Sequence, residues 1–183
     1  MSTTELSPAR LNFLFRLGRC EIHLKPIQLA VTALLAGFLT AGCASSGHTD
    51  SQLRHLEAQA QIERRIQEIF AAAQGKDFNR LDSYHLYGPS FTKFTGSSPE
   101  RLDAVTARKG EHDGLGAING LKMRADGLKV DVFGNAAIAT FTLNYSFESN
   151  GQTIDRKERT SLIFVRDGGD WKITHEHLSP IKP

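Results

Sequence analysis

Acidic, basic and imidazole side chains recur at every second position near the end of the chain. Arg156 and Glu158 occur on one such stretch, and His175 and His177 occur on the next. Burial in an apolar cavity raises the pKa of a carboxylate, and a neighbouring imidazole can carry protons. Glu158 and His177 are therefore candidates for an acid/base pair. Two other interpretations stay open: an ion pair at a sheet rim beside hydrogen-bonded histidines, or a ligand site without catalysis.

Two turns set the register that would bring these side chains together. Asn150-Gly151 is a strong hairpin signal, because both residues tolerate the positive φ that a type I′ turn demands. With a two-residue loop there, Tyr145 faces Arg156 and Leu143 faces Glu158.

Gly168-Gly169 gives the second turn, which on the same assumption pairs Leu162 with His175 and Thr160 with His177. Mostly apolar faces with a few converging polar groups are typical of small-molecule pockets. The predicted pocket contains Tyr145, Arg156, Glu158, His175 and His177. A change of one residue in the second loop would reverse the last strand and place Glu176, rather than the histidines, in the pocket.

Other candidate sites have weaker patterns. His175 and His177 could ligate zinc, but no third ligand with metal-site spacing accompanies them. Glu111-His112-Asp113 is expected in a loop, where solvated side chains are the simpler interpretation. We predict no metal and no cofactor, and find no phosphate-binding glycine loop, G-x-S-x-G motif or catalytic cysteine. A further aromatic group could cover a cavity mouth or simply pack under a helix: Tyr84, His85 and Tyr87.

The elements that must position these residues change in period along the chain. Apolar residues recur every three or four positions between Asp50, the expected N-cap, and Gly75, which predicts a long amphipathic helix. A short helix is expected over 78–87, and Ser98-Pro99 predicts a third that runs to about Lys109. Beyond Gly120 the period is two, as in strands. Helices followed by an antiparallel meander predict an α+β domain with helices on one face of a curved sheet.

The N-terminal segment carries a targeting pattern. Four basic residues precede the apolar run Pro26–Leu39, which is short for a membrane span. The run ends in Leu39-Thr40-Ala41-Gly42-Cys43, which resembles a bacterial lipoprotein signal. That resemblance implies cleavage before Cys43 and acylation of its thiol and amine, with several acyl chains holding the protein on a membrane. An uncut anchoring helix, or ordinary cleavage nearby, is the alternative.

These patterns divide the chain into a signal peptide over 1–42, a lipidated Cys43 with a flexible tether over 43–50, and one domain over 51–183. Removal of the first segment takes away four basic and two acidic residues, leaving 18 of each sign. A formally neutral chain without a basic stripe argues against nucleic-acid binding. With Cys20 discarded and Cys43 acylated, no cysteine pair remains for a disulfide. We expect a bacterial envelope protein that faces the periplasm, preferably on the outer membrane.

The stretch Glu158–Ser179 carries an aspartate-glycine turn, Trp171, and a His-x-His before a serine. It resembles the closing hairpin of SnoaL-like domains in the nuclear transport factor 2-like superfamily, and of the calcium/calmodulin-dependent kinase II association domain. The resemblance covers roughly 52–179 and implies a cone-shaped fold, a cavity between helices and sheet, and often a homodimer formed through the sheet. Ser161 and Leu178 stand where the association domain has its pocket arginines, so that basic pocket is not reproduced.

Members of this superfamily include enzymes, assembly modules and binding proteins, so the fold does not fix the function. We favour an exported, noncatalytic module that binds a small apolar or amphipathic molecule, assembles as a dimer, or does both. The alternative is a cofactor-independent isomerase, dehydratase or cyclase that uses Glu158 and His177 for proton transfer.

Overall fold

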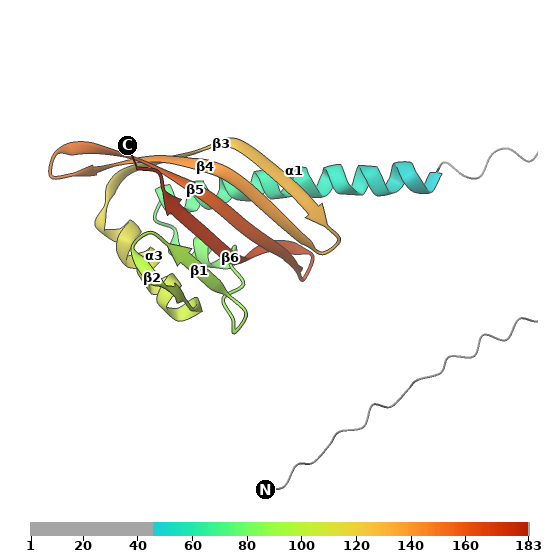
Figure 1. Ribbon diagram of the computed structural model, residues 1–183, viewed down its shortest axis with the longest axis horizontal. Coiled ribbons are helices and arrows are strands. Elements are labelled where there is room, and N and C mark those ends of the chain that lie inside the picture. Colours follow the sequence, from blue (N-terminus) through green and yellow to red (C-terminus); the bar gives the residue numbers. More distant parts are fainter. Residues whose placement is uncertain (1–45, 183) are drawn as a thin grey trace, which may run out of the picture. The chain divides into compact units, whose positions relative to one another are not determined.

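The computed structural model describes residues 46–182, which form three helices and six strands (Figure 1). The proposed signal peptide and Cys43 lie outside the described residues. Among those described, no helix combines the length and apolar character needed to cross a membrane. In chain order the elements are α1 Ser46–Gln74, α2 Phe78–Ser83, β1 Thr92–Thr95, β2 Ser98–Leu102, α3 Ala104–Ala117, β3 Asn119–Phe133, β4 Ala136–Ser149, β5 Gln152–Asp167 and β6 Asp170–Pro180.

The six strands form one sheet in the order β2-β1-β6-β5-β4-β3. Neighbouring strands in this sheet are antiparallel, except that β1 runs parallel to β6. Figure 1 shows the long strands β3 to β6 curving together, with α1 running along them and α3 beside β1 and β2. The predicted α+β class, with helices first and a curved, mostly antiparallel sheet afterwards, is confirmed.

The core lies between α1 and one face of the sheet. Ile62 and Ile66 on α1 are fully buried, as their helical spacing predicts. Phe70 packs edge-on against Phe141 of β4, with ring centroids 6.1 Å apart. Every second residue of β4 from Ala137 to Leu143 is buried, so the period of two marks the face that meets the helices.

Two helix starts differ from prediction. α1 begins at Ser46, so it includes part of the proposed tether, and Asp50 lies within the helix, where it pairs with Arg54 at 3.0 Å. Ser98-Pro99 begins strand β2 rather than a helix. Proline is tolerated there because β2 is at the edge of the sheet, where a missing N–H breaks no ladder. The N-cap is Asp103, whose carboxylate accepts a hydrogen bond from the backbone N–H of Thr106 at 2.8 Å.

The first predicted turn and its register are confirmed. Asn150 and Gly151 have φ values of 51° and 75°, and they connect β4 to β5 as a two-residue loop. Tyr145 lies opposite Arg156, and Leu143 lies opposite Glu158, as expected.

The second two-residue loop is also present, with Asp167 opposite Asp170, but the register predicted beyond it is wrong. Phe164 pairs with Ile173 and Ile163 with His175, so Thr174 is an extra residue on β6. Such a β-bulge shifts every later side chain to the other face of the sheet.

As a result, Glu176 rather than His175 faces Leu162, and Leu178 rather than His177 faces Thr160. The end of β6 therefore presents its side chains to the opposite faces, as expected for a change of one residue in the second loop. The extra residue, however, lies inside β6 and not in that loop.

Candidate functional site

Helices α1 and α3 and the inner face of the sheet enclose a cavity of about 280 Å³. This volume is close to the lower end of small-molecule pockets. Most of the lining is apolar. It includes Phe70 of α1, Leu115 of α3, and Phe141, Leu143 and Leu162 of the sheet.

Part of the α3 wall of the cavity is bare backbone. Gly110 and Gly114 both line the cavity from α3, and their spacing of four places them on the same face of that helix. A methyl group built at either position would meet no atom within 4 Å. The absence of side chains at these two positions therefore leaves room in the cavity.

A buried ion cluster forms the polar end of the cavity, and its centre is Glu176 on β6. His85, in the segment after α2, places its Nε2 3.0 Å from Oε1 of Glu176, and its Nδ1 2.9 Å from the backbone oxygen of Leu81. A backbone carbonyl and a carboxylate only accept hydrogen bonds, so both ring nitrogens must donate. This geometry fits a His85 imidazolium beside an ionised Glu176, with only 1% and 8% of their side chains exposed.

Lys93 on β1 joins this pair to a second carboxylate. Its ammonium lies 2.5 Å from Oε2 of Glu176 and also forms an ion pair with Glu111 of α3. The other oxygen of Glu111 accepts a hydrogen bond of 2.8 Å from the hydroxyl of Tyr87. Tyr87 in turn stacks on the imidazole of His85, with ring centroids 4.9 Å apart. Two cations and two carboxylates thus lie together at the end of an apolar cavity.

Burial and mutual charge set the protonation of this cluster. Burial alone would raise the pKa of Glu176, but the charge of Lys93 and the hydrogen bond from His85 outweigh it and lower that pKa. Burial would likewise lower the pKa of His85, yet Glu176 raises it overall. The pKa of Glu111 is raised by burial and by the charge of Glu176. The pKa of Lys93 is also raised, because its two carboxylates outweigh its burial.

Two polar atoms at the cavity lack hydrogen-bond partners within residues 46–182. One is the hydroxyl oxygen of Thr160, which is buried on β5. The other is Oε2 of Glu176, whose contact is the ion pair with the Lys93 ammonium at 2.5 Å. Both residues line the cavity. The two oxygen atoms themselves are covered by protein atoms, and the charge on Oε2 of Glu176 is already balanced by Lys93.

The same cluster has the composition of a metal site. His85, Glu111 and Glu176 offer ligand atoms that lie within 4.8 Å of one another. Lys93, however, already pairs with both carboxylates. A divalent cation would have to displace that ammonium and deprotonate His85, so the cluster is better described as an ion network that contains its own cations.

The predicted histidines lie on the other face of the sheet. Nδ1 of His175 is 2.7 Å from the hydroxyl of Thr92, and Phe94 packs edge-on against both His175 and His177. His177 is exposed. The prediction that these two side chains share a pocket with Glu158 is wrong, because the bulge at Thr174 reverses β6.

The other predicted pocket residues lie together and are not members of the ion cluster, although the charge of Lys93 acts on Glu158. The Tyr145 hydroxyl donates a long hydrogen bond of 3.4 Å to Glu158, and burial raises the pKa of that carboxyl. Arg156 donates to the backbone oxygen of Asp155 at 2.9 Å, so the structure does not show the proposed Arg156–Glu158 ion pair.

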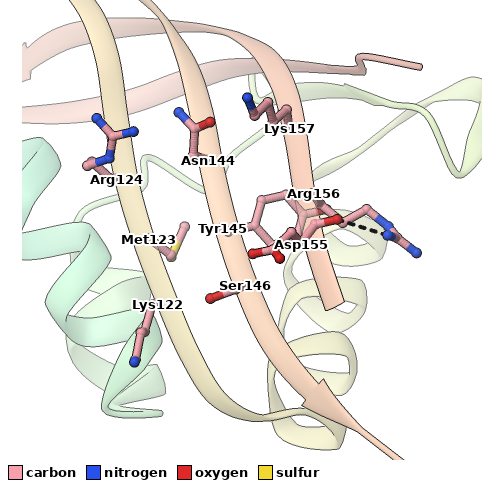
Figure 2. A pocket seen from close by; sticks show the side chains of 9 residues that line it. All are labelled: Lys122, Met123, Arg124, Asn144, Tyr145, Ser146, Asp155, Arg156 and Lys157. Atoms are coloured by element: carbon pink, nitrogen blue, oxygen red, sulfur yellow. Dashed lines mark hydrogen bonds between the residues drawn. The ribbon is translucent and has the colours of Figure 1, made fainter. Parts of the chain in front are cut away.

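Tyr145 and Arg156 instead border an open groove of about 380 Å³ at β3, β4 and β5 (Figure 2). Figure 2 shows Arg124, Asn144 and Lys157 side by side on the three strands, as the register also requires. Charged residues, most of them basic, therefore border this groove, unlike the cavity between helices and sheet.

The sequence analysis missed most of the cluster. Glu111 was expected in a solvated loop, but α3 continues through Gly110 to Ala117 and turns Glu111 towards Lys93. In the segment 84–87, His85 stacks on Tyr87, but it also lines the cavity and pairs with Glu176, so packing alone does not describe its role. Glu176 was named as a pocket residue only for a reversed last strand, which is the arrangement that the bulge produces.

Comparison with known proteins defines the class. The SnoaL-like domain family matches residues 62–183. The chain belongs to this family. Curated proteins give no match.

Solved structures show the same fold at low sequence identity. A Novosphingobium aromaticivorans nuclear transport factor 2-like protein with a cystatin-like fold has a TM-score of 0.63 and 15% identity, covering 77% of this chain and 93% of its own. A candidate dehydratase from Streptomyces avermitilis gives 0.61 and 17%, covering 68% and 96%. The Chlamydomonas reinhardtii calcium/calmodulin-dependent kinase II hub homology domain gives 0.58 and 16%, covering 68% and 98%.

Proposed function

We propose that this domain binds a small, mainly apolar molecule in the cavity between α1, α3 and the sheet, without catalysing a reaction. The observation that carries the proposal is an apolar cavity of about 280 Å³ that ends on a few convergent polar groups. This combination is typical of small-molecule sites.

The protonation of the cluster favours binding over proton transfer. A general acid or base works best with a pKa near the working pH. The environment lowers the pKa of Glu176 and raises the pKa of Tyr87 and Lys93, in each case away from neutrality. Burial raises the pKa of Glu111 towards neutrality, but its two oxygens are already occupied by the Lys93 ammonium and the Tyr87 hydroxyl. The alternative pair, Glu158 and His177, lies on opposite faces of the sheet, so direct proton transfer between them is not supported.

Filling the cavity tests the proposal. Gly114→Leu places a side chain in the cavity from α3, where a Cβ meets no atom within 4 Å. Gly116→Leu is the matched control, because Gly116 is on the same helix, has equal room for a Cβ and is not part of the lining. Native mass spectrometry of the purified chain should find a copurified small molecule in the parent and in the control, and none in Gly114→Leu. Equal occupancy in both variants would count against the cavity as the site.

We also propose assembly through the outer face of the sheet. Phe94 is 41% exposed there, beside His175 and His177. One solved structure with this fold is a kinase hub homology domain, and the word hub describes a domain that assembles. Phe94→Ser should shift the chain towards the monomer in sedimentation-velocity experiments, whereas a monomeric parent would refute this part of the proposal.

Lipid anchoring is the third part of the proposal, and the sequence pattern ending in Cys43 supports it. An anchored protein would act at the bacterial envelope and face the periplasm. Cys43→Ser should move the chain from the membrane fraction to the soluble fraction and remove the mass of the acyl chains. If the mass of the parent chain equals the mass calculated without acyl chains, lipidation is refuted.

A further inference from the structure

We propose that the open groove on the outer face of the sheet binds a phosphate group, carried by a small phosphate ester or by an anionic lipid headgroup. The phosphate would lie over Asn144 of β4, between Arg124 of β3 and Lys157 of β5 (Figure 2). Phe94, on the surface proposed for assembly, is on β1, beyond β6. The groove is also separate from the cavity, so this proposal does not depend on the cavity-binding function.

The groove forms because short side chains on β4 lie between longer side chains on its two neighbours. Leu143 is buried on the cavity face, so the alternation of β4 places Asn144 and Ser146 on the outer face. The register gives two rows across the groove: Arg124–Asn144–Lys157 and Lys122–Ser146–Asp155. β4 is thus the floor of a groove of about 380 Å³, a volume within the range of small-molecule sites.

Positive charge is in excess on this part of the outer face. Together with the next row of the sheet, four cationic and two acidic side chains are on this face: Lys122, Arg124, Lys157, Arg159, Asp126 and Asp155. A phosphate monoester carries about two negative charges at pH 7. Its charge therefore matches the excess, whereas a neutral molecule would leave the excess uncompensated.

The two walls of the groove differ in the contacts that they already make. The Arg124 guanidinium donates to both oxygens of Asp126, at 2.8 Å for Oδ2, and the side-chain amide of Asn144 donates to Oδ2 at 2.9 Å. These bonds orient the guanidinium and use two of its five N–H donors. Lys157 is exposed and pairs with no carboxylate among residues 46–182. Both walls therefore keep donors for an anion.

The directions of these donors favour a phosphate group over a carboxylate. A guanidinium and an ammonium donate from opposite walls, and the hydroxyl of Ser146 on the floor can also donate. Phosphate oxygens point to the corners of a tetrahedron, so they can accept from both walls and from the floor. The two oxygens of a carboxylate lie in one plane and cannot reach all three.

Three soluble probes separate charge from shape: glycerol 3-phosphate, succinate and glycerol. Their binding to the full-length chain at pH 7 and low ionic strength can be measured by chemical-shift titration, which also distinguishes groove amides from cavity amides. We expect glycerol 3-phosphate to bind, succinate to bind several-fold more weakly and glycerol to cause no shift. Added salt should weaken the binding, because an exposed charged site is screened.

Lys157→Gln removes one charge from an exposed side chain, so the fold should tolerate it. It should weaken glycerol 3-phosphate about fivefold, as expected for one exposed ion pair. Lys129→Gln is the matched control, because Lys129 is on the same face, pairs with Asp131 at 2.8 Å and does not line the groove. It should leave the affinity unchanged. Asp126→Asn should tighten binding several-fold, because it releases Arg124.

Vesicles distinguish the two sources of the phosphate group. The Cys43→Ser variant is used in this experiment, so that no acyl chain at that position contributes. Cosedimentation with phosphatidylglycerol vesicles but not with phosphatidylcholine vesicles, lost in Cys43→Ser with Lys157→Gln, would identify a lipid headgroup. Binding of glycerol 3-phosphate without vesicle binding would identify a soluble ester.

The proposal is overturned if succinate binds as tightly as glycerol 3-phosphate, or if Lys157→Gln and Lys129→Gln behave alike. It is also overturned if neither the soluble probes nor the vesicles bind. The cavity-binding function would survive each of these results, because Gly114→Leu tests it separately.

Discussion

Removal of the Lys93 ammonium is the sharpest perturbation of the buried cluster. Only 12% of this side chain is exposed, and it pairs with Glu111 and Glu176, whose side chains are 15% and 8% exposed. Lys93→Met keeps the apolar stem and leaves two carboxylates facing each other. Breaking a buried pair by removing one partner costs about 3–5 kcal/mol, which is a large share of the roughly 5–15 kcal/mol that stabilise a typical domain.

The stability that Lys93→Met loses should be larger at pH 7 than at pH 4. In the parent, Lys93 and His85 lower the pKa of Glu176, so this residue stabilises the fold above the ordinary carboxyl pKa of about 4.3 and loses that contribution as pH falls through the folded value. Without Lys93, burial and the neighbouring Glu111 raise the same pKa, and the variant loses stability as pH rises. The difference between the two proteins should therefore be small near pH 4 and complete at pH 7.

Urea unfolding followed by fluorescence can measure this difference, since Trp171 is the single tryptophan and is buried. Lys109→Met is the matched control, because Lys109 is 75% exposed and pairs with Asp113 on the surface of α3. Its loss should stay below about 0.5 kcal/mol at both pH values. An equal loss at pH 4 and pH 7 for Lys93→Met, or one no larger than the control, would refute the description of the cluster as an ion network.

Three further substitutions and one control variant test the free energy of unfolding at other positions. Gly114→Ala should raise the free energy of unfolding by about 0.5–1 kcal/mol, because alanine suits a helix better and its methyl group has room. Gly134→Ala should lower it by about 1 kcal/mol, because φ there is +63°; similar values for the two glycine variants in urea would contradict both statements. His85→Ala should cost about 3 kcal/mol in the same assay, since it leaves Glu176 buried with one cation fewer. At concentrations too low for the proposed assembly, His177→Ala, on the exposed outer face, should stay within about 0.5 kcal/mol, and a larger loss would contradict its placement outside the ion cluster.

The main elements of the fold could be predicted because their signals are local. The helical spacing of Ile62, Ile66 and Phe70 marks the buried face of α1, and Asn150-Gly151 marks the hairpin between β4 and β5. Each signal depends on residues within a few positions of one another. The start of α3 was missed because Ser98-Pro99 also suits an edge strand, and the choice between a strand and a helix depended on β1 alongside it.

The ion cluster could not be predicted, because its members come from four separate parts of the chain. His85 follows α2, Lys93 is on β1, Glu111 is on α3 and Glu176 is on β6. None of them is close to another in sequence, and Lys93 and Glu111 are individually ordinary charged residues. The parallel pairing of β1 with β6 places Lys93 beside Glu176, and the positions of α3 and of the segment after α2 add Glu111 and His85.

The bulge at Thr174 decides which chemistry each face of the sheet presents. Without it, the alternation of β6 would place His175 and His177 at the cavity and Glu176 outside, and Lys93 would then meet no acid on β6. With it, the one acid of the His-Glu-His sequence joins Lys93, Glu111 and His85, while the two histidines remain outside beside Phe94. A buried lysine needs a carboxylate partner. The parallel β1–β6 pairing and the bulge therefore support each other, and a chain that lost either would have to lose the ion cluster as well.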